Sequence, residues 1–160
     1  MAGEGVTHLD AGRPMVVRKP DSAFTLANFL RANLYSSMAT LKIGMDILAA
    51  ENVKIDSLTG HGGLFKTPEV GQSYMAAACK APVTVMETAG EGGPYGMALL
   101  AAYRSEEGSD TLEAFLRNKV FSSVKSTTMQ PDSADAEGFA RYLENFKAVL
   151  TAEKAAVENF

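Results

Sequence analysis

The chain has 160 residues, of which 46% are hydrophobic and 21% charged, and its formal net charge is −4 at pH 7. This length is that of one domain or a small pair. The acidic balance argues against nucleic acid and anionic membrane as partners, because both require a basic face. The single cysteine, Cys79, excludes an intrachain disulfide. No signal peptide and no apolar run of about 20 residues is present, so a cytoplasmic protein is predicted.

The first 20 residues contain three glycines, two prolines and one short apolar run, Met15-Val16-Val17. That run could form an edge strand. The segment has no clear start of its own, and two interpretations are equally open. It is either chain that enters from a missing N-terminal half or a frayed terminus.

A long amphipathic helix is predicted from Asp21 or Ser22, either of which can cap a helix after Pro20. Its apolar positions recur every three or four residues: Leu30, Leu34, Met38, Leu41, Met45 and Leu48. This spacing places them on one face over about five turns.

The middle of the chain alternates between strands, glycine-rich turns and helices. Strands are predicted at 53–58 and 82–86, helices at about 67–80 and 95–103, and glycine-rich turns at 59–63 and 88–94. This order is typical of an α/β fold. A short helix is predicted at 112–116 and a last helix from Asp132.

The first glycine-rich turn, Thr59-Gly60-His61-Gly62-Gly63, joins a strand to a helix start. Glycine lets the backbone approach a ligand and permits positive φ, and a helix N-terminus attracts anions. There is no P-loop motif, and neither glycine cluster has the Rossmann spacing. By itself the turn favours a purely structural interpretation, in which it packs helix against strand.

A fuller set of motifs carries a family resemblance. The set comprises Leu58-Thr59-Gly60-His61-Gly62-Gly63, then Gln72, Pro82-Val83 and Gly96-Met97-Ala98-Leu99-Leu100-Ala101-Ala102. In this order and spacing, over roughly residues 21 to 104, they resemble the C-terminal domain of FGGY-family carbohydrate kinases, among which pentulose kinases such as xylulose kinase are the most similar. Two departures stand out: His61 replaces a plain glycine, and Gly92-Gly93-Pro94 replaces the commoner Glu-x-x-Ala.

The resemblance implies a ribonuclease H-like, actin-like ATPase domain with helices packed on a mixed sheet. It implies ATP or ADP as the ligand and transfer of the γ-phosphate to a sugar hydroxyl, xylulose or a related ketopentose being the expected acceptor. Gly62 and Gly63 would lie against the ribose and α-phosphate, and Leu64 to Thr67 would line the adenine and ribose. The nucleotide-binding residues predicted in this way are Gly60, His61, Gly62, Gly63, Leu64, Lys66 and Thr67. For His61, capping of the loop is the simpler interpretation.

The predicted organisation is a segment at 1–20 that enters from a missing N-terminal half, a nucleotide-binding core at 21–104 and a helical extension at 105–160. No catalytic residue or metal ligand is predicted here, because phosphoryl transfer needs a base and Mg²⁺-binding carboxylates, which the family takes mainly from its N-terminal, sugar-binding domain. The chain alone is therefore expected to be inactive, as a piece of a longer kinase or the product of a split gene. Its exposed apolar face would permit a homodimer.

Two alternatives stay open. One is a non-kinase member of the same ATPase superfamily that binds ATP without a sugar. The other is a stand-alone interaction domain whose glycine loops are purely structural.

Overall fold

The computed structural model describes residues 2–106 and 111–159. The chain divides into two compact units. Unit 1 comprises Met1–Ile55, Tyr74–Lys80 and Pro131–Phe160, and unit 2 comprises Asp56–Ser73 and Ala81–Gln130. Helix α2 (Val70–Cys79) contributes its beginning to unit 2 and the rest to unit 1.

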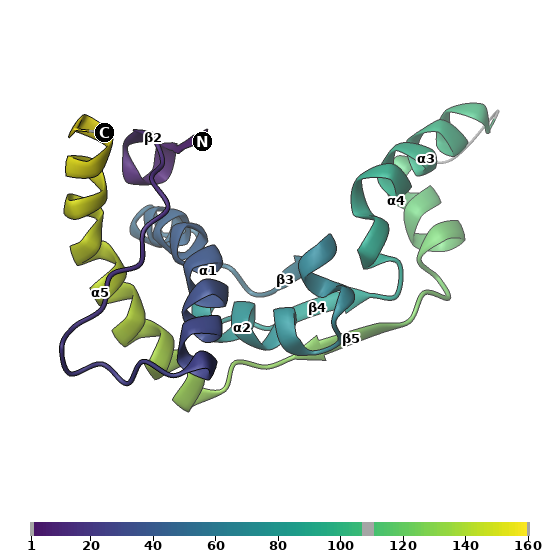
Figure 1. Ribbon diagram of the computed structural model, residues 1–160. Coiled ribbons are helices and arrows are strands. Elements are labelled where there is room, and N and C mark those ends of the chain that lie inside the picture. Colours follow the sequence, from purple (N-terminus) through teal and green to yellow (C-terminus); the bar gives the residue numbers. More distant parts are fainter. Residues whose placement is uncertain (1, 107–110, 160) are drawn as a thin grey trace. The chain divides into compact units, whose positions relative to one another are not determined.

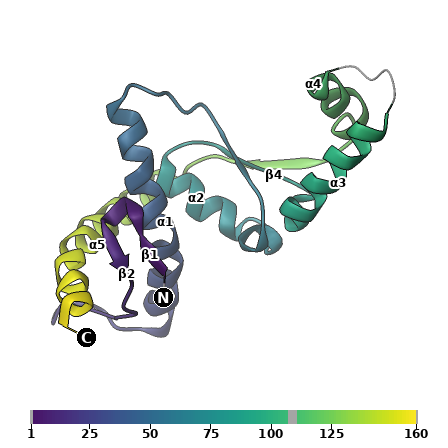
Figure 2. The ribbon, with the colours of Figure 1, turned by 90° about the horizontal axis from the view of Figure 1, so that it is seen from above.

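Unit 1 is built on two long helices, α1 (Leu26–Ala50) and α5 (Ser133–Asn159), which pack against each other (Figure 1). A small antiparallel hairpin, β1 (Ala2–Glu4) and β2 (Leu9–Ala11), is joined by the 3₁₀ turn η1 (Gly5–Thr7). The hairpin contacts both helices, through η1 on α1 and β2 on α5 (Figure 2). The residues predicted as a possible edge strand, 15–17, are not a strand, and Val16 is 70% exposed.

The core of unit 1 is small and is built around a cluster of aromatic side chains. The Tyr35 ring lies against the rings of Tyr74, Phe139 and Tyr142, with centroids 5.4, 5.2 and 5.2 Å away. The Tyr142 hydroxyl donates a hydrogen bond to the Ala32 carbonyl at 3.3 Å. The pairs with Tyr74 and Phe139 are edge-to-face, and such pairs stabilise beyond the area they bury. Tyr35 is therefore the centre of the packing between α1 and α5.

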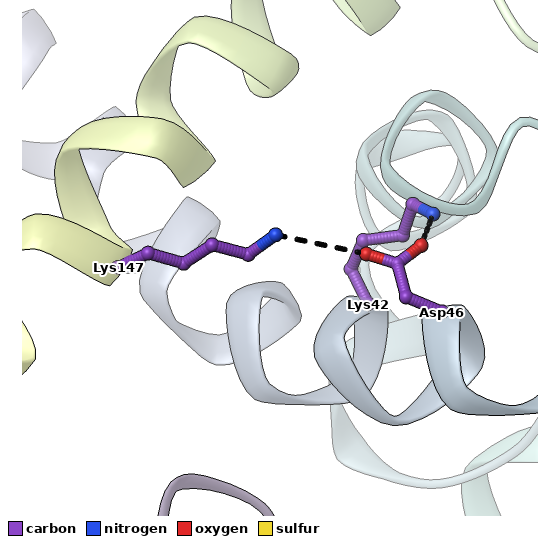
Figure 3. A network of polar contacts seen from close by, with 3 residues as sticks. All are labelled: Lys42, Asp46 and Lys147. Carbon is purple, nitrogen blue, oxygen red and sulfur yellow. Dashed lines mark hydrogen bonds and ion pairs between the residues drawn. The ribbon is translucent and has the colours of Figure 1, made fainter. Parts of the chain in front are cut away.

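An ion-pair network also joins the two helices. Asp46 of α1 pairs with Lys42 one turn earlier, and its other oxygen lies 3.8 Å from the Lys147 ammonium of α5 (Figure 3). All three side chains retain solvent exposure. Their contribution to stability is therefore expected to be under about 1 kcal/mol.

The start of α1 differs from the prediction. The helix begins after Thr25, whose hydroxyl oxygen accepts from the Asn28 amide at 3.2 Å, whereas the Ser22 hydroxyl donates to the Lys19 carbonyl and closes a turn after Pro20. At the other end, Asn52 adopts a φ of 61° and the Val53 amide donates to the Leu48 carbonyl. This is a Schellman closure, which occupies the first residue of the predicted strand 53–58.

Unit 2 contains a mixed sheet in the order β3-β4-β5 (Figure 1). Strand β3 (Leu58–Gly60) runs parallel to β4 (Val83–Met86), and β5 (Ser126–Met129) runs antiparallel to β4. The predicted α/β fold with helices on a mixed sheet is confirmed. Strand β5 was not predicted.

The remaining elements of unit 2 are the 3₁₀ turns η2 (Gly63–Lys66) and η3 (Ala89–Glu91), helix α3 (Gly92–Ser105), the short helix α4 (Leu112–Phe115) and the π-helical turn η4 (Leu116–Val120). Helices α3 and α4 meet through the rings of Tyr103 and Phe115, 5.4 Å apart. No helix within the described residues combines the length and apolar character that a membrane crossing requires. The domain boundaries predicted after residues 20 and 104 stay predictions.

Cys79 is the last residue of α2 and is half-buried. Burial raises the pKa of its thiol above the ordinary 9.0, and the nearby Asp46 carboxylate acts in the same direction while Lys42 opposes it. The neutral thiol is a poor nucleophile, so this cysteine is suited to packing rather than chemistry.

Candidate functional site

The first glycine-rich turn begins within β3, whose last two residues are Thr59 and Gly60, and leads through η2 to α2. Gly62 precedes η2 with φ 101° and ψ −173°, a conformation that L side chains rarely adopt. Its carbonyl accepts from the Phe65 amide at 3.1 Å. The backbone therefore reverses sharply at the end of the strand, and the reversal depends on glycine at this position.

Two other glycines are required by close packing. A Cβ on Gly60 would lie 2.5 Å from the ring of Phe65, and a Cβ on Gly71 would lie 2.7 Å from the Leu64 carbonyl oxygen. Both glycines are buried. Gly60 and Gly71 thus let the residues of η2 fold down onto the strand end and the helix.

Gly62 and Gly63 have open space beside them. No heavy atom lies within 4 Å of the position that a Cβ would take on either residue. The Gly62 amide is nevertheless used by the protein, since it donates to the Ala89 carbonyl at 2.7 Å. A ligand lying here would therefore meet the bare Cα faces of the pair but not the Gly62 amide.

The second glycine-rich turn, which includes η3, lies against the first. The stem of Lys66 lies over Gly90, where an added Cβ would be 3.3 Å from its Cε. The His61 side chain lies over Gly92, where an added Cβ would be 3.0 Å from the His61 Cβ. The structure thus brings the two glycine-rich turns together through backbone and side-chain contacts.

A groove of about 610 Å³ opens beside this pair of turns, between the start of α2, the end of β4 and the start of β5. Its lining includes Phe65, Lys66 and Glu69 from the first turn and α2, Glu87 to Gly90 after β4, and Lys125 to Thr127 at β5. Of the seven predicted nucleotide-binding residues, Lys66 alone lines the groove. His61, Gly63 and Thr67 are exposed elsewhere on the loop, Leu64 is half-buried above Gly71, and Gly60 is buried.

Gln72 of α2 holds the groove floor together. It is 4% exposed, its amide nitrogen donates to the carbonyls of Val83 and Thr127 at 3.1 and 3.0 Å, and its amide oxygen accepts from the Thr127 hydroxyl at 3.1 Å. Since all of these partners belong to β4 and β5, Gln72 cross-links the helix to the antiparallel pair.

Within the described residues, no three His, Cys, Asp or Glu side chains gather in a way that could hold a metal ion.

Comparison with known proteins decides the family. Residues 1–105 match the family described as FGGY family of carbohydrate kinases, C-terminal domain. The chain belongs to this family. The solved structure of xylulose kinase from Rhodospirillum rubrum is also similar, with a TM-score of 0.62 at 18% identity, and the match covers 91% of this chain and 29% of that one. No curated protein matches the chain.

These findings confirm the resemblance and the actin-like fold of this FGGY C-terminal domain. At 18% identity the likeness to xylulose kinase shows the fold alone. The chain spans less than a third of that kinase.

Sequence reasoning missed the contacts between the two turns. It identified residues 88–94 only as a second glycine-rich turn. One signal could have indicated these contacts. The chain departs from the family pattern both at Gly92-Gly93-Pro94 and at His61, and the structure places His61 over Gly92.

Proposed function

We propose that this FGGY C-terminal domain binds the nucleoside part of ATP for a sugar kinase. The observation that carries the proposal is the open space at Gly62 and Gly63, where a Cβ would occupy room that nothing in the protein fills. Such a bare backbone stretch between strand and helix suits the close approach of a nucleotide. Family membership supports ATP as the ligand.

In the complete kinase, ATP would supply the γ-phosphoryl group to a sugar hydroxyl. The residues for this domain's part are Gly62 and Gly63 against the ribose and α-phosphate, and Leu64 to Thr67 on the adenine side. The Lys66 ammonium would attract phosphate oxygens. The base, the Mg²⁺ ligands and the sugar site are assigned to an N-terminal domain, because the described residues contain no carboxylate cluster.

A ketopentose such as xylulose is the proposed acceptor. This part rests on the motif resemblance to pentulose kinases. Joining the chain to the N-terminal half of such a kinase and comparing ketopentoses with aldopentoses as acceptors would test it. Nucleotide binding without phosphorylation of any sugar would favour the non-kinase alternative.

The nucleotide site is tested by titrating ADP into the ¹⁵N-labelled chain. We expect the amide signals of residues 60–67 to shift and to give a Kd far above 1 μM, because half of the cleft is absent. A Kd of 1 μM corresponds to a binding free energy of about −8 kcal/mol. Gly63→Ala should weaken binding several-fold, since its Cβ would enter the open space. Gly93→Ala is the matched control, as that position also has no atom within 4 Å.

An absence of shifts in this loop, or an unchanged Kd in Gly63→Ala, would remove these residues from the site, and micromolar or tighter binding would contradict the incomplete cleft. In a complete kinase, Gly62→Val should raise KM for ATP. Gly63→Ala is the cleaner variant, because Gly62 has a left-handed φ that valine resists.

A further inference from the structure

We propose that residues 88–92 of the second glycine-rich turn position the nucleotide loop, residues 60–67. They act through the Ala89 carbonyl and through the bare backbone of Gly90 and Gly92. The inference rests on the proposed nucleotide site and assigns a role to a motif that the site itself leaves unexplained. Gly90 and Gly92 are positioning residues, since Gly90 contacts Lys66 of the loop and Gly92 contacts His61.

The first step is the backbone anchor. Ala89 is 1% exposed, so its peptide group is held by packing, and its carbonyl accepts from the Gly62 amide at 2.7 Å. Gly62 is the residue at which the loop reverses with a left-handed φ. The buried turn therefore fixes the backbone at the point where the loop is otherwise most free to move.

The second step concerns why residues 90 and 92 are glycines. Among the described glycines, Gly62 alone has a left-handed φ, so backbone conformation does not require glycine at 90 or 92. Their missing Cβ atoms are explained by what lies on them. The Lys66 stem passes 3.3 to 3.9 Å from the Cβ position of Gly90, and the His61 side chain lies 3.0 to 3.6 Å from that of Gly92.

It follows that Gly90 and Gly92 determine where the side chains of Lys66 and His61 lie. Gly93, the next residue, has no neighbour within 4 Å of its Cβ position. A methyl group added at position 92 should thus displace the His61 side chain, and one added at position 90 should displace the Lys66 side chain. A methyl group added at position 93 should displace nothing. The effect on a nucleotide would be indirect, through the side chains that move.

The experiment uses the whole chain with three variants, Gly90→Ala, Gly92→Ala and Gly93→Ala, and two readouts. The ring ¹H–¹³C signals of His61 report on its position, and ADP titration reports on affinity. We expect Gly92→Ala to shift the His61 ring signals and Gly90→Ala to weaken ADP binding several-fold. Gly93→Ala should change neither. In a Lys66→Ala background, Gly90→Ala should have no further effect on affinity, because the residue through which it acts is gone.

The outcomes separate this inference from the proposed function. If the parent chain binds ADP but Gly90→Ala and Gly92→Ala bind it equally well, positioning is wrong and the nucleotide site stands. If the parent chain binds no ADP, the proposed function fails, and unmoved His61 ring signals in Gly92→Ala would overturn the positioning contact as well. Should Gly92→Ala unfold, Gly90→Ala still decides, since its neighbour is a flexible lysine stem.

Discussion

Glycines of one short segment serve different physical purposes at the scale of the single residue. Gly60 makes room for the Phe65 ring, and Gly62 adopts a φ of 101°. Gly63 has neither constraint among the described atoms, which makes it the most informative position for a ligand. A sequence motif of consecutive glycines hides these differences, because the letter is the same in each case.

Gln72 shows how a family motif can be structural. Replacing it by leucine should remove two donors from the carbonyls of Val83 and Thr127 and one acceptor from the Thr127 hydroxyl. We expect Gln72→Leu to lower the free energy of unfolding by about 1–3 kcal/mol, the usual cost of leaving buried polar groups unpaired. Urea denaturation followed by circular dichroism measures it.

The control for this variant is Gln130→Leu, at an exposed position. Equal stability losses in both variants would show that the three hydrogen bonds of Gln72 carry no special weight.

At the scale of the element, the start of α1 distinguishes a sequence rule from a structural outcome. Both Ser22 and Thr25 are good capping residues, but the Thr25 oxygen is the one that accepts from the Asn28 amide. We expect Thr25→Ala to cost about 1 kcal/mol of unfolding free energy, measured by urea denaturation. Ser22→Ala should cost less, because its hydroxyl closes only a local turn at Lys19. The reverse order would place the helix start three residues earlier.

Elements were predicted well where their signal is periodic and long. The stripe from Leu30 to Leu48 lies within α1, and the tail helix predicted from Asp132 is α5, Ser133–Asn159. Short strands were predicted less evenly: the predicted strand 82–86 contains β4, whereas the predicted strand 53–58 overlaps β3 only at Leu58 and β5 was missed. Ser126–Met129 has four residues without apolar alternation and becomes a strand because it pairs with β4, from Val83↔Met129 to Met86↔Ser126.

Alkaline pH should weaken the unit that contains α1 and α5, a prediction at the scale of the whole molecule. Burial raises the pKa of Tyr35 above the ordinary 10.0, and the Asp135 charge adds to this; burial also raises the pKa of Tyr142, against a hydrogen bond with Ser36. The fold therefore favours the neutral phenols. Their stabilising contribution is complete below about pH 10 and is lost as pH rises through the raised values.

We expect urea midpoints to fall as the pH rises above about 10, and to fall less in Tyr35→Phe, which has no phenol to titrate at the centre of the cluster. A variant that loses as much stability as the parent chain over this range would show that Tyr35 ionisation does not limit the alkaline stability.

The whole chain carries large exposed hydrophobic side chains, among them Val16, Phe24, Leu26, Leu30, Met97 and Leu100. Where such side chains are contiguous, they commonly mark an interaction site. Since the chain spans 29% of the similar kinase, an N-terminal domain is the partner we propose for such surface, and the homodimer stays a prediction.

The sequence by itself determined the order of helices, strands and glycine-rich turns between Leu26 and Ser105, and through the motifs from Leu58 to Ala102 it identified the family. These properties depend on local periodicity and on neighbours along the chain. Only the tertiary structure decided that the Gly62 amide donates to the Ala89 carbonyl and that Lys66 and His61 lie on Gly90 and Gly92. It also decided that Gln72 joins α2 to β4 and β5. Each of these contacts joins residues distant in sequence, and their geometry is set by how the strands and helices pack.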